Sequence, residues 1–257
     1  MSLVIYTVKD RVGYLTLNRP EKRNALNHEL ITELMEAFDR AETDAEVKVV
    51  VLKANGDAFC AGADLAYLQQ LQHFSFEENL EDSRHLKNLF LKIYQLKKIV
   101  IAQVQGHALA GGCGLATICD FAFAVPEARF GYTEVKIGFI PALVSVFLVR
   151  KVGEHKTKQL LLTGEVFKAP KALALGLINE VVIPEDIEQH VNEFAAGLIS
   201  SNSGQSMQLT KQLISQVQSL PLGEALEHAA RMNATARATD DCKAGIIAFL
   251  NKQALKW

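Results

Sequence analysis

Two dense apolar runs, each followed by a loop of small residues and a helical pattern, constrain the fold more than any other feature. The runs cover residues 47–53 and 99–104 and are rich in valine and isoleucine. Short strands that are apolar throughout are typical of parallel sheets that helices cover on both faces. The loops that follow contain residues 61–64 and 106–114, and helical spacing resumes after each. The sequence therefore predicts an α/β protein built from repeated strand, loop and helix units.

The rest of the chain fits this pattern at its start and departs from it at its end. Residues 4–8 and 12–17 predict a β-hairpin, and Asn27 predicts the cap of an amphipathic helix. Further strands are expected at 121–125 and 178–182, whereas only helical spacing follows from about residue 186. We expect a core of residues 1–195 that holds the functional site, and a helical region of residues 196–257.

Composition excludes several classes of protein. Hydrophobic residues make up 49% of the chain, and the net charge of −2 offers no basic surface for nucleic acid or an anionic membrane. The four cysteines form no C-x-x-C pair, and no metal-ligand spacing occurs. Residues 99–119 carry no charge, but their glycines and polar residues favour a strand, a turn and a buried helix over a membrane span. No signal peptide is recognisable, so we expect a cytoplasmic protein without membrane or nucleic-acid partners.

The two small-residue loops are the strongest candidates for chemistry. Each leaves a buried strand and enters a helix, where backbone N–H groups lack intrahelical partners. If the loops converge, two such groups can hold one oxygen, as in an oxyanion hole. A phosphate cradle is the alternative, although residues 111–114 do not supply the spacing of a dinucleotide-binding loop. A third interpretation is that the glycines serve only tight turns and close packing.

Several linked motifs closely resemble the crotonase (enoyl-CoA hydratase/isomerase) superfamily, in the same order and over nearly the whole chain. They are NRPEKRNAL at 18–26, FCAGADL at 59–65, GHALAGGCG at 106–114, FGYTE at 130–134 and IGFIP at 137–141. The resemblance implies a spiral of ββα units followed by C-terminal helices that mediate trimerisation, commonly in a hexamer built as a dimer of trimers. It also implies acyl-CoA as the ligand, with no separate cofactor because CoA is part of the substrate.

The resemblance further assigns roles to residues of these motifs. It places the thioester oxygen between the N–H groups of Ala63 and Gly111, in agreement with the loop argument. It places CoA near residues 22–26 and 61–65. It places Phe249 and Lys252 beside the nucleotide portion of the CoA that a neighbouring subunit binds. The substrate and CoA positions are Lys22, Ala25, Leu26, Ala61, Gly62, Asp64, Leu65, Gly112, Gly114, Phe249 and Lys252. Asp64 also occupies the position of a helix cap.

One departure from the family pattern bears on the reaction. Hydratases of this family typically use two glutamates, and only the second is present here, as Glu134, because Gly114 occupies the first position. Glu134 follows an apolar segment that would keep a carboxyl group poised for proton transfer. The bulky segment at 140–147 replaces a glycine-rich run, and together with Gly114 it looks most like bacterial methylglutaconyl-CoA hydratases of leucine degradation.

Three functions from different classes remain open at this point. The first is hydration of a 2-enoyl-CoA to a 3-hydroxyacyl-CoA by a lyase. The second is an enoyl-CoA isomerase, because a single glutamate suffices to move a proton between two carbons. The third is a non-catalytic acyl-CoA binder in which Gly114 marks a lost catalytic group. Assays of hydration and of isomerisation distinguish the three.

Overall fold

A six-stranded sheet forms the centre of the protein, for which the computed structural model describes residues 2–255 and 257. Its strand order is β1-β2-β3-β5-β7-β10. The first two strands form the predicted antiparallel hairpin, and every later pairing in this sheet is parallel. The bounds are β1 Val4–Lys9, β2 Val12–Leu17, β3 Val49–Ala54, β5 Ile99–Val104, β7 Phe121–Ala124 and β10 Glu180–Val181. The parallel sheet expected from the two apolar runs is therefore confirmed.

A second sheet of four short strands stands beside the first, in the order β4-β6-β8-β9. The bounds are β4 Ala58–Cys60, β6 His107–Leu109, β8 Arg129–Gly131 and β9 Phe167–Lys168. Strands β4, β6 and β8 pair in parallel, and β9 closes the edge in antiparallel orientation. The sequence predicts loops where β4 and β6 form. Strands of three residues are too short to show an alternation of apolar and polar residues, so the sequence gives no sign of them.

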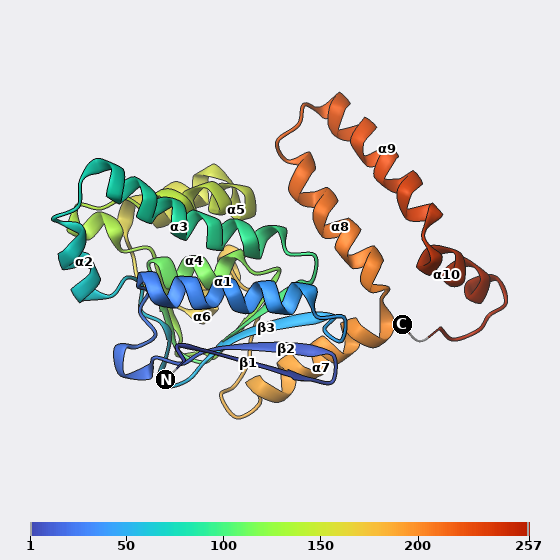
Figure 1. Cartoon of the computed structure of the whole chain (residues 1–257), viewed down its shortest axis with the longest axis horizontal. Coiled ribbons are helices and arrows are strands. Elements are labelled where there is room, and N and C mark those ends of the chain that lie inside the picture. Colours follow the sequence, from blue (N-terminus) through green and yellow to red (C-terminus); the bar gives the residue numbers. More distant parts are fainter. Residues whose placement is uncertain (1, 256) are drawn as a thin grey trace.

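Helices cover both faces of the larger sheet (Figure 1). Asn27 caps the first helix as predicted, accepting a hydrogen bond from the Leu30 N–H at 2.9 Å. Gly153, at φ +78°, interrupts the fifth helix and divides it into two segments. The bounds are α1 His28–Thr43, α2 Leu65–Leu71, α3 Phe76–Gln95, α4 Gly111–Ile118, α5 Ala142–Thr163, α6 Ala169–Leu175 and α7 Ile187–Ser201, with 3₁₀ helices η1 Pro20–Lys22 and η2 Glu134–Ile137.

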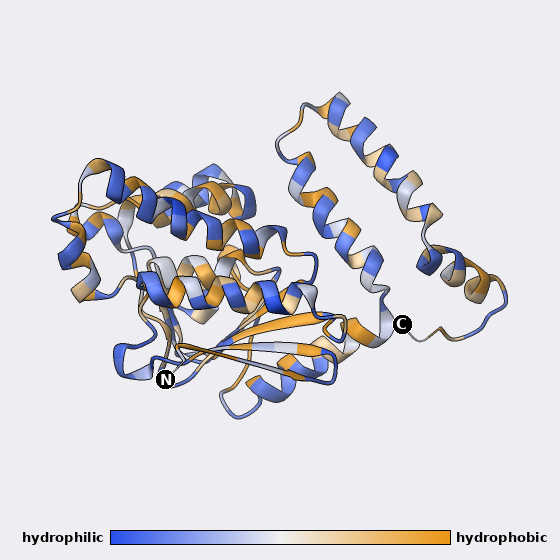
Figure 2. Cartoon of the chain, in the orientation of Figure 1, coloured by the Kyte–Doolittle hydropathy of each residue, from blue (hydrophilic) through white to orange (hydrophobic). Residues whose placement is uncertain are grey.

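The core lies between the larger sheet and these helices. Residues Val49 to Leu52 of β3 are entirely buried, as are most residues of β5 and α4. Figure 2 shows the hydrophobic colouring that runs along β3. The charge-free stretch 99–119 forms β5, β6 and α4, which confirms the expected strand, turn and buried helix. Within the described residues, no helix has the length and hydropathy that crossing a membrane requires.

The last three helices form an arm that extends from the body, with α8 packed on α3 and β5 (Figure 1). They are α8 Gly204–Val217, α9 Leu222–Ala238 and α10 Asp240–Leu250. Helix α7 crosses the expected boundary at 195/196 and packs on β3, β5 and β7, so the arm begins only after Ser201. Val191 of α7 is fully buried in the core, whereas Leu226 and Phe249 of the arm are 63% and 82% exposed. The exposed apolar residues that the sequence predicts for subunit contacts are therefore found on the arm, whereas Val191 of α7 belongs to the core.

Candidate active site

A buried asparagine holds the loop that carries the first motif. Asn24 is fully buried, and its Oδ1 accepts a hydrogen bond from the Arg19 N–H at 2.8 Å. Its Nδ2 donates to the carbonyls of Asn55 and Ala58 at 2.9 and 2.8 Å. Asn24 itself has φ +54°, a left-handed conformation that asparagine tolerates better than most residues. Loop 19–26 is thereby tied to the segment that leads into β4.

The same loop fixes the residue predicted to supply the first N–H donor. The Leu26 N–H donates to the Gly62 carbonyl at 2.7 Å, and the Asp64 N–H donates to the Leu26 carbonyl at 2.8 Å. Ala63 lies between these two bonds, which form an isolated parallel bridge with Leu26. The peptide groups on either side of Ala63 are therefore held, while its own N–H donates no hydrogen bond to any described backbone acceptor.

The two small-residue loops converge, as the oxyanion hypothesis requires. A Cβ placed on Gly62 would lie 2.9 Å from the Ala110 Cβ, and one placed on Gly111 would lie 3.1 Å from Leu26 Cδ1. Gly112 packs so closely on β4 that its Cβ would lie 2.1 Å from the Cys60 carbonyl oxygen. These contacts bring the start of α4 against the Ala61–Asp64 loop and need glycine at 62 and 112.

The backbone before each donor has an unusual conformation. Gly62 has φ +92°, and Ala110 has φ +48° and ψ −124°. An alanine at positive φ stores strain, which persists only where the surroundings impose it. The Ala110 N–H donates to the Gly131 carbonyl at 2.8 Å, which ties this turn to β8. Gly111 is the first residue of α4, so its N–H has no intrahelical partner and is free to bind a ligand.

Glu134 begins the 3₁₀ helix that follows β8, and β8 pairs with β6 beside the Ala110 turn. The residue is half-buried, and its Oε2 is shielded from solvent without a hydrogen-bond partner among the described residues. Burial raises the pKa of the Glu134 carboxyl above its usual 4.5, against the smaller effect of its own backbone N–H. Burial raises the pKa of the Cys113 thiol in α4 and of the Tyr132 hydroxyl, and the negative charge of Glu134 adds to both shifts. Glu134 is thus a carboxyl poised for proton transfer beside the start of α4.

The space beside Gly114 is filled by neighbouring side chains. A Cβ at this position would lie 2.4 Å from Val144 Cγ1 and 3.1 Å from Phe90 Cζ. Val144 and Phe90 are buried at 7% and 1% exposure. Hydrocarbon from α5 and α3 therefore fills the space that a side chain at 114 would enter, so the site has one carboxylate on this side rather than two.

The remaining predicted positions divide into two groups. Ala25 and Leu26 are buried in the first loop, Ala61 joins that loop through its N–H to the Arg23 carbonyl at 3.0 Å, and Lys22 and Leu65 are exposed beside them. Phe249 and Lys252 lie at the far end of the arm and not at the loops of their own chain (Figure 1).

The Asp64 carboxylate is fully engaged within the protein. Its Oδ1 accepts hydrogen bonds from the N–H groups of Ala66 and Tyr67 at 2.8 and 3.3 Å, and so caps α2 as the sequence predicts. Its Oδ2 lies 2.6 Å from Arg19 Nη1. Arg19, Asn24 and Val144 are parts of the site that sequence reasoning missed. Arg19 and Asn24 stand inside the quoted 18–26 motif, but no local pattern shows which buried group each would meet.

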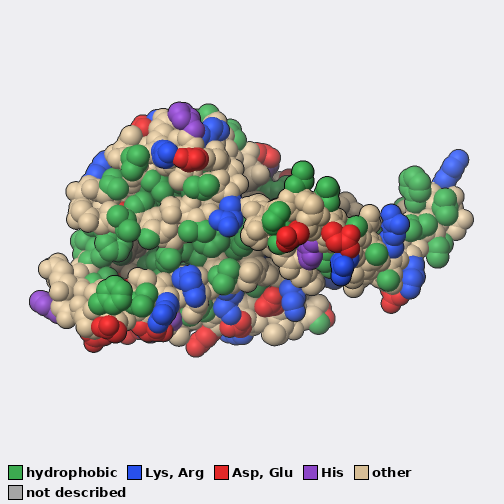
Figure 3. Space-filling view, turned by 90° about the horizontal axis from the view of Figure 1, so that it is seen from above, with side chains coloured by type: hydrophobic (Ala, Val, Ile, Leu, Met, Phe, Trp, Pro, Cys, Tyr) green, Lys and Arg blue, Asp and Glu red, His purple; other side chains and the backbone are tan. Residues whose placement is uncertain are grey.

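Large apolar side chains stand exposed close to Glu134 in the chain. Ile137, Phe139 and Ile140 are 71%, 56% and 67% exposed, and Leu65, next to the Ala63 loop, is 79% exposed. Figure 3 shows hydrophobic side chains gathered over the body. Exposed apolar surface of this extent is typical of ligand or subunit contacts.

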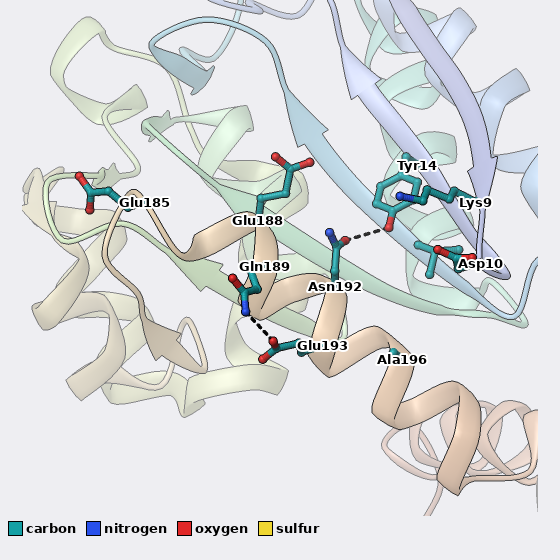
Figure 4. A pocket seen from close by; sticks show the side chains of 10 residues that line it. Lys9, Asp10, Tyr14, Glu185, Glu188, Gln189, Asn192, Glu193 and Ala196 are labelled. Carbon is teal, nitrogen blue, oxygen red and sulfur yellow. Dashed lines mark hydrogen bonds between the residues drawn. The ribbon is translucent and has the colours of Figure 1, made fainter.

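A separate hollow of about 600 Å³ lies between the β1–β2 turn and α7 (Figure 4). It is lined by acidic side chains, among them Asp10, Glu188 and Glu193, and is crossed by the hydrogen bond from Tyr14 Oη to Asn192 Oδ1 at 2.8 Å. None of its lining residues belongs to the predicted acyl-CoA site. Among the described residues, no three His, Cys, Asp or Glu side chains gather as metal ligands.

Comparison with known proteins agrees with this geometry. The sequence profile of the enoyl-CoA hydratase/isomerase family matches residues 7–257. The crotonyl-CoA hydratase of Syntrophomonas wolfei is 35% identical over 97% of this chain and 95% of its own length. The 2,3-dehydroadipyl-CoA hydratase of Escherichia coli is 34% identical over 98% of this chain and 97% of its own length.

Solved structures show the same fold. An enoyl-CoA hydratase of Mycobacterium smegmatis superposes with a TM-score of 0.92 at 32% identity, covering 99% of this chain and 98% of that one. An enoyl-CoA hydratase of Shewanella pealeana gives a TM-score of 0.93 at 32% identity, with coverage of 99% and 96%. The chain has the crotonase fold and belongs to the enoyl-CoA hydratase/isomerase family.

Proposed function

We propose that this protein is a lyase that hydrates a 2-enoyl-CoA thioester to a 3-hydroxyacyl-CoA. One observation carries the proposal: Glu134, half-buried and with an unpartnered Oε2, follows β8, and β8 is hydrogen-bonded to the Ala110 turn that precedes Gly111. A proton-transfer group next to a pair of N–H donors is the combination that enolate chemistry needs. Relatives named as hydratases of crotonyl-CoA and of 2,3-dehydroadipyl-CoA support it.

The reaction follows from these groups. The N–H groups of Ala63 and Gly111 hold the thioester oxygen and stabilise the negative charge that develops on it. Glu134 holds a water, whose oxygen attacks the β-carbon as a proton passes to the carboxylate. The resulting enolate takes that proton back at the α-carbon. The elements of one water molecule are thereby added across the double bond, and Glu134 returns to its ionised form.

The single carboxylate also keeps an isomerase as the second candidate function. Val144 fills the place of a second acid, so one group must both accept and deliver the proton. A lone carboxylate performs the same two steps when it moves a proton between two carbons of a 3-enoyl-CoA. A non-catalytic acyl-CoA binder is the third candidate, and the shielded Oε2 of Glu134, which has no hydrogen-bond partner among the described residues, argues against it.

We propose 3-methylglutaconyl-CoA, an intermediate of leucine degradation, as the substrate to test first. Support comes from the bulky 140–147 segment, which together with Gly114 resembles bacterial methylglutaconyl-CoA hydratases. In the structure, Val144 of this segment packs against Gly114. Crotonyl-CoA is the comparison substrate, because one relative is named for it. We further propose that no separate cofactor is needed, that the protein works in the cytoplasm, and that it assembles as a trimer or hexamer through the arm. The exposed Leu226 and Phe249 support that assembly.

The decisive experiment compares the wild type with Glu134→Gln. Hydration of both enoyl-CoA substrates is followed by loss of the enoyl-thioester absorbance, and a 3-enoyl-CoA is offered in parallel to detect isomerisation. Glutamine keeps the shape of the side chain but cannot accept a proton, so kcat should fall by about 10²–10⁴-fold while CoA affinity stays near that of the wild type.

Three outcomes contradict the proposal in different ways. A Glu134→Gln variant that hydrates within a few-fold of the wild type rejects the mechanism. A wild type that isomerises but does not hydrate makes the protein an isomerase. A wild type that does neither, yet binds acyl-CoA, is a binder. Glu165→Gln serves as the matched control, because Glu165 is an exposed glutamate that pairs with Lys171.

A further inference from the structure

The ion pair between Arg19 and Asp64 is one of two in the described part of the chain whose partners are both largely buried, and the other, Lys211–Asp120, lies away from the candidate site. The Arg19 and Asp64 side chains are 15% and 7% exposed, with 2.6 Å between Nη1 and Oδ2. Surface pairs such as Arg84–Glu81 are 55% and 75% exposed. Exposed pairs contribute little to stability, whereas breaking a buried pair leaves an uncompensated charge in a poorly solvated place.

The contacts of this pair enclose the Ala63 donor. Arg19 Nη1 also donates to the Ala25 carbonyl at 3.2 Å, so one guanidinium nitrogen joins the residue before Leu26 to the residue after Ala63. Leu26 in turn bonds the peptide groups on both sides of Ala63. The ring that runs through Arg19, Ala25, Leu26 and Asp64 leaves the Ala63 N–H little freedom of direction.

The pair also controls the charge beside this donor. Burial opposes ionisation of Asp64, but hydrogen bonds from Arg19 and from the N–H groups of Tyr67 and Ala66 outweigh it and hold its pKa below the usual value. Asp64 is therefore an anion, one residue away from the N–H that is to receive the enolate oxygen. Without Arg19 this negative charge would oppose the one that develops on the substrate.

We propose that Arg19 is a positioning residue for the reaction, fixing the direction of the Ala63 N–H and neutralising Asp64 beside the developing enolate. Arg19 touches no reacting atom, and it acts through Ala63 and Asp64. The inference rests on the proposed function, because it assigns Arg19 a task in polarising an enoyl thioester.

The test uses Arg19→Met, the double variant Arg19→Met/Asp64→Asn, and Arg84→Met as the control arginine on the surface of α3. The probe is 4-(dimethylamino)cinnamoyl-CoA, a chromophoric enoyl thioester whose absorbance shifts to the red when its carbonyl is polarised. The shift is measured on binding, without turnover. kcat and KM for hydration of crotonyl-CoA are measured in parallel.

Arg19→Met should lower kcat by about 10–100-fold, somewhat less than the loss of a whole donor, with KM changed by less than about threefold. The red shift of the bound probe should shrink with it. The double variant has no unpaired charge, and an asparagine in place of Asp64 can still cap α2. The double variant should therefore recover part of both kcat and the red shift. Both should stay below the wild-type values, because the hydrogen bond from Arg19 to the Ala25 carbonyl is lost. Arg84→Met should behave as the wild type.

The proposal is overturned if folded Arg19→Met keeps the full kcat and red shift, or if the double variant is no better than the single one. If Arg19→Met does not fold, the double variant decides alone, and a full red shift in it overturns the proposal. A wild type that polarises the probe but hydrates nothing rejects the proposed function instead. The dependence of the red shift on Arg19 still tests the inference in that case.

Discussion

Replacing Gly114 by alanine tests whether the place of the missing acid is filled. Gly114 lies in the first half of α4, where alanine is favoured over glycine by about 1 kcal/mol. The new methyl would lie 2.4 Å from Val144 Cγ1, whereas carbon atoms in ordinary contact are about 3.5–4.0 Å apart. Such overpacking costs about 1–3 kcal/mol, so Gly114→Ala should destabilise the wild type by roughly 0–2 kcal/mol.

The sign should reverse once Val144 is shortened. Val144→Ala removes both Cγ atoms and by itself should cost about 1–3 kcal/mol. In that background only the 3.1 Å approach to the Phe90 ring edge remains, and a small movement of the ring relieves it. Gly114→Ala should then stabilise by about 0.5–1 kcal/mol through helix propensity alone. The double-mutant cycle should therefore show a coupling free energy of about 0.5–3 kcal/mol.

The assay is equilibrium urea unfolding of the four proteins at one protomer concentration, because an oligomer's apparent stability depends on concentration. Thermal unfolding gives a second measure, with about 2–4 °C expected per kcal/mol for a chain of this length. The reasoning is refuted if Gly114→Ala changes the free energy of unfolding equally in both backgrounds, to within about 0.5 kcal/mol. That result would mean that position 114 has room for a side chain.

Three further predictions concern the donor, the base and the assembly. Ala63→Pro removes one N–H, so turnover should fall by about 10²–10³-fold, and a folded variant with near wild-type turnover would refute the role of Ala63. Because burial raises the pKa of Glu134, the acid limb of kcat/KM should lie above pH 4.5 in a pH–rate profile. The pKa of Glu134 is higher in the folded than in the unfolded protein, so the folded state favours the protonated carboxyl. The free energy of unfolding therefore falls as pH rises through the folded-state pKa of Glu134. Glu134→Gln should unfold at a higher temperature than the wild type at neutral pH, and the two should converge below about pH 4. Light scattering should show a trimer or hexamer, and a stable monomer at micromolar concentration would contradict the proposed assembly. Phe249→Asp should weaken the assembly, because Phe249 is 82% exposed in the single chain and would lie at the subunit contact.

Long and strongly patterned elements could be predicted from the sequence. The hairpin, the two buried strands and the Asn27 cap follow from periodicity and local side-chain chemistry, and the structure has them within one or two residues at most ends. The second sheet could not be predicted, because β4, β6 and β8 have three residues each and depend on partners far away in the sequence. The sequence predicts the arm's helices, but not that α7 packs on the sheet, that α8 contacts β5, and that α9 and α10 extend away from the body.

The candidate site was only partly predictable for a related reason. Small residues that follow a buried strand suggest free N–H groups in the two loops, and the resemblance to the family points to Ala63 and Gly111 within them. That Arg19 would reach Asp64 depends on how two loops of different strands meet, and no spacing along the chain encodes that distance. The same holds for Val144, which comes from α5 to occupy the space beside Gly114.

The close approach of Gly62 and Ala110 bears on the width of the proposed oxyanion hole. The two donors follow these residues directly, and each comes after a different strand of the smaller sheet, so the distance between them depends on how closely the two loops approach. Hydrogen bonds tolerate changes of several tenths of an ångström, whereas repulsion between touching carbon atoms rises steeply. A methyl group added at position 62 would lie 2.9 Å from the Ala110 Cβ, closer than carbon atoms in ordinary contact, so we expect it to push the two loops apart and to widen the proposed oxyanion hole.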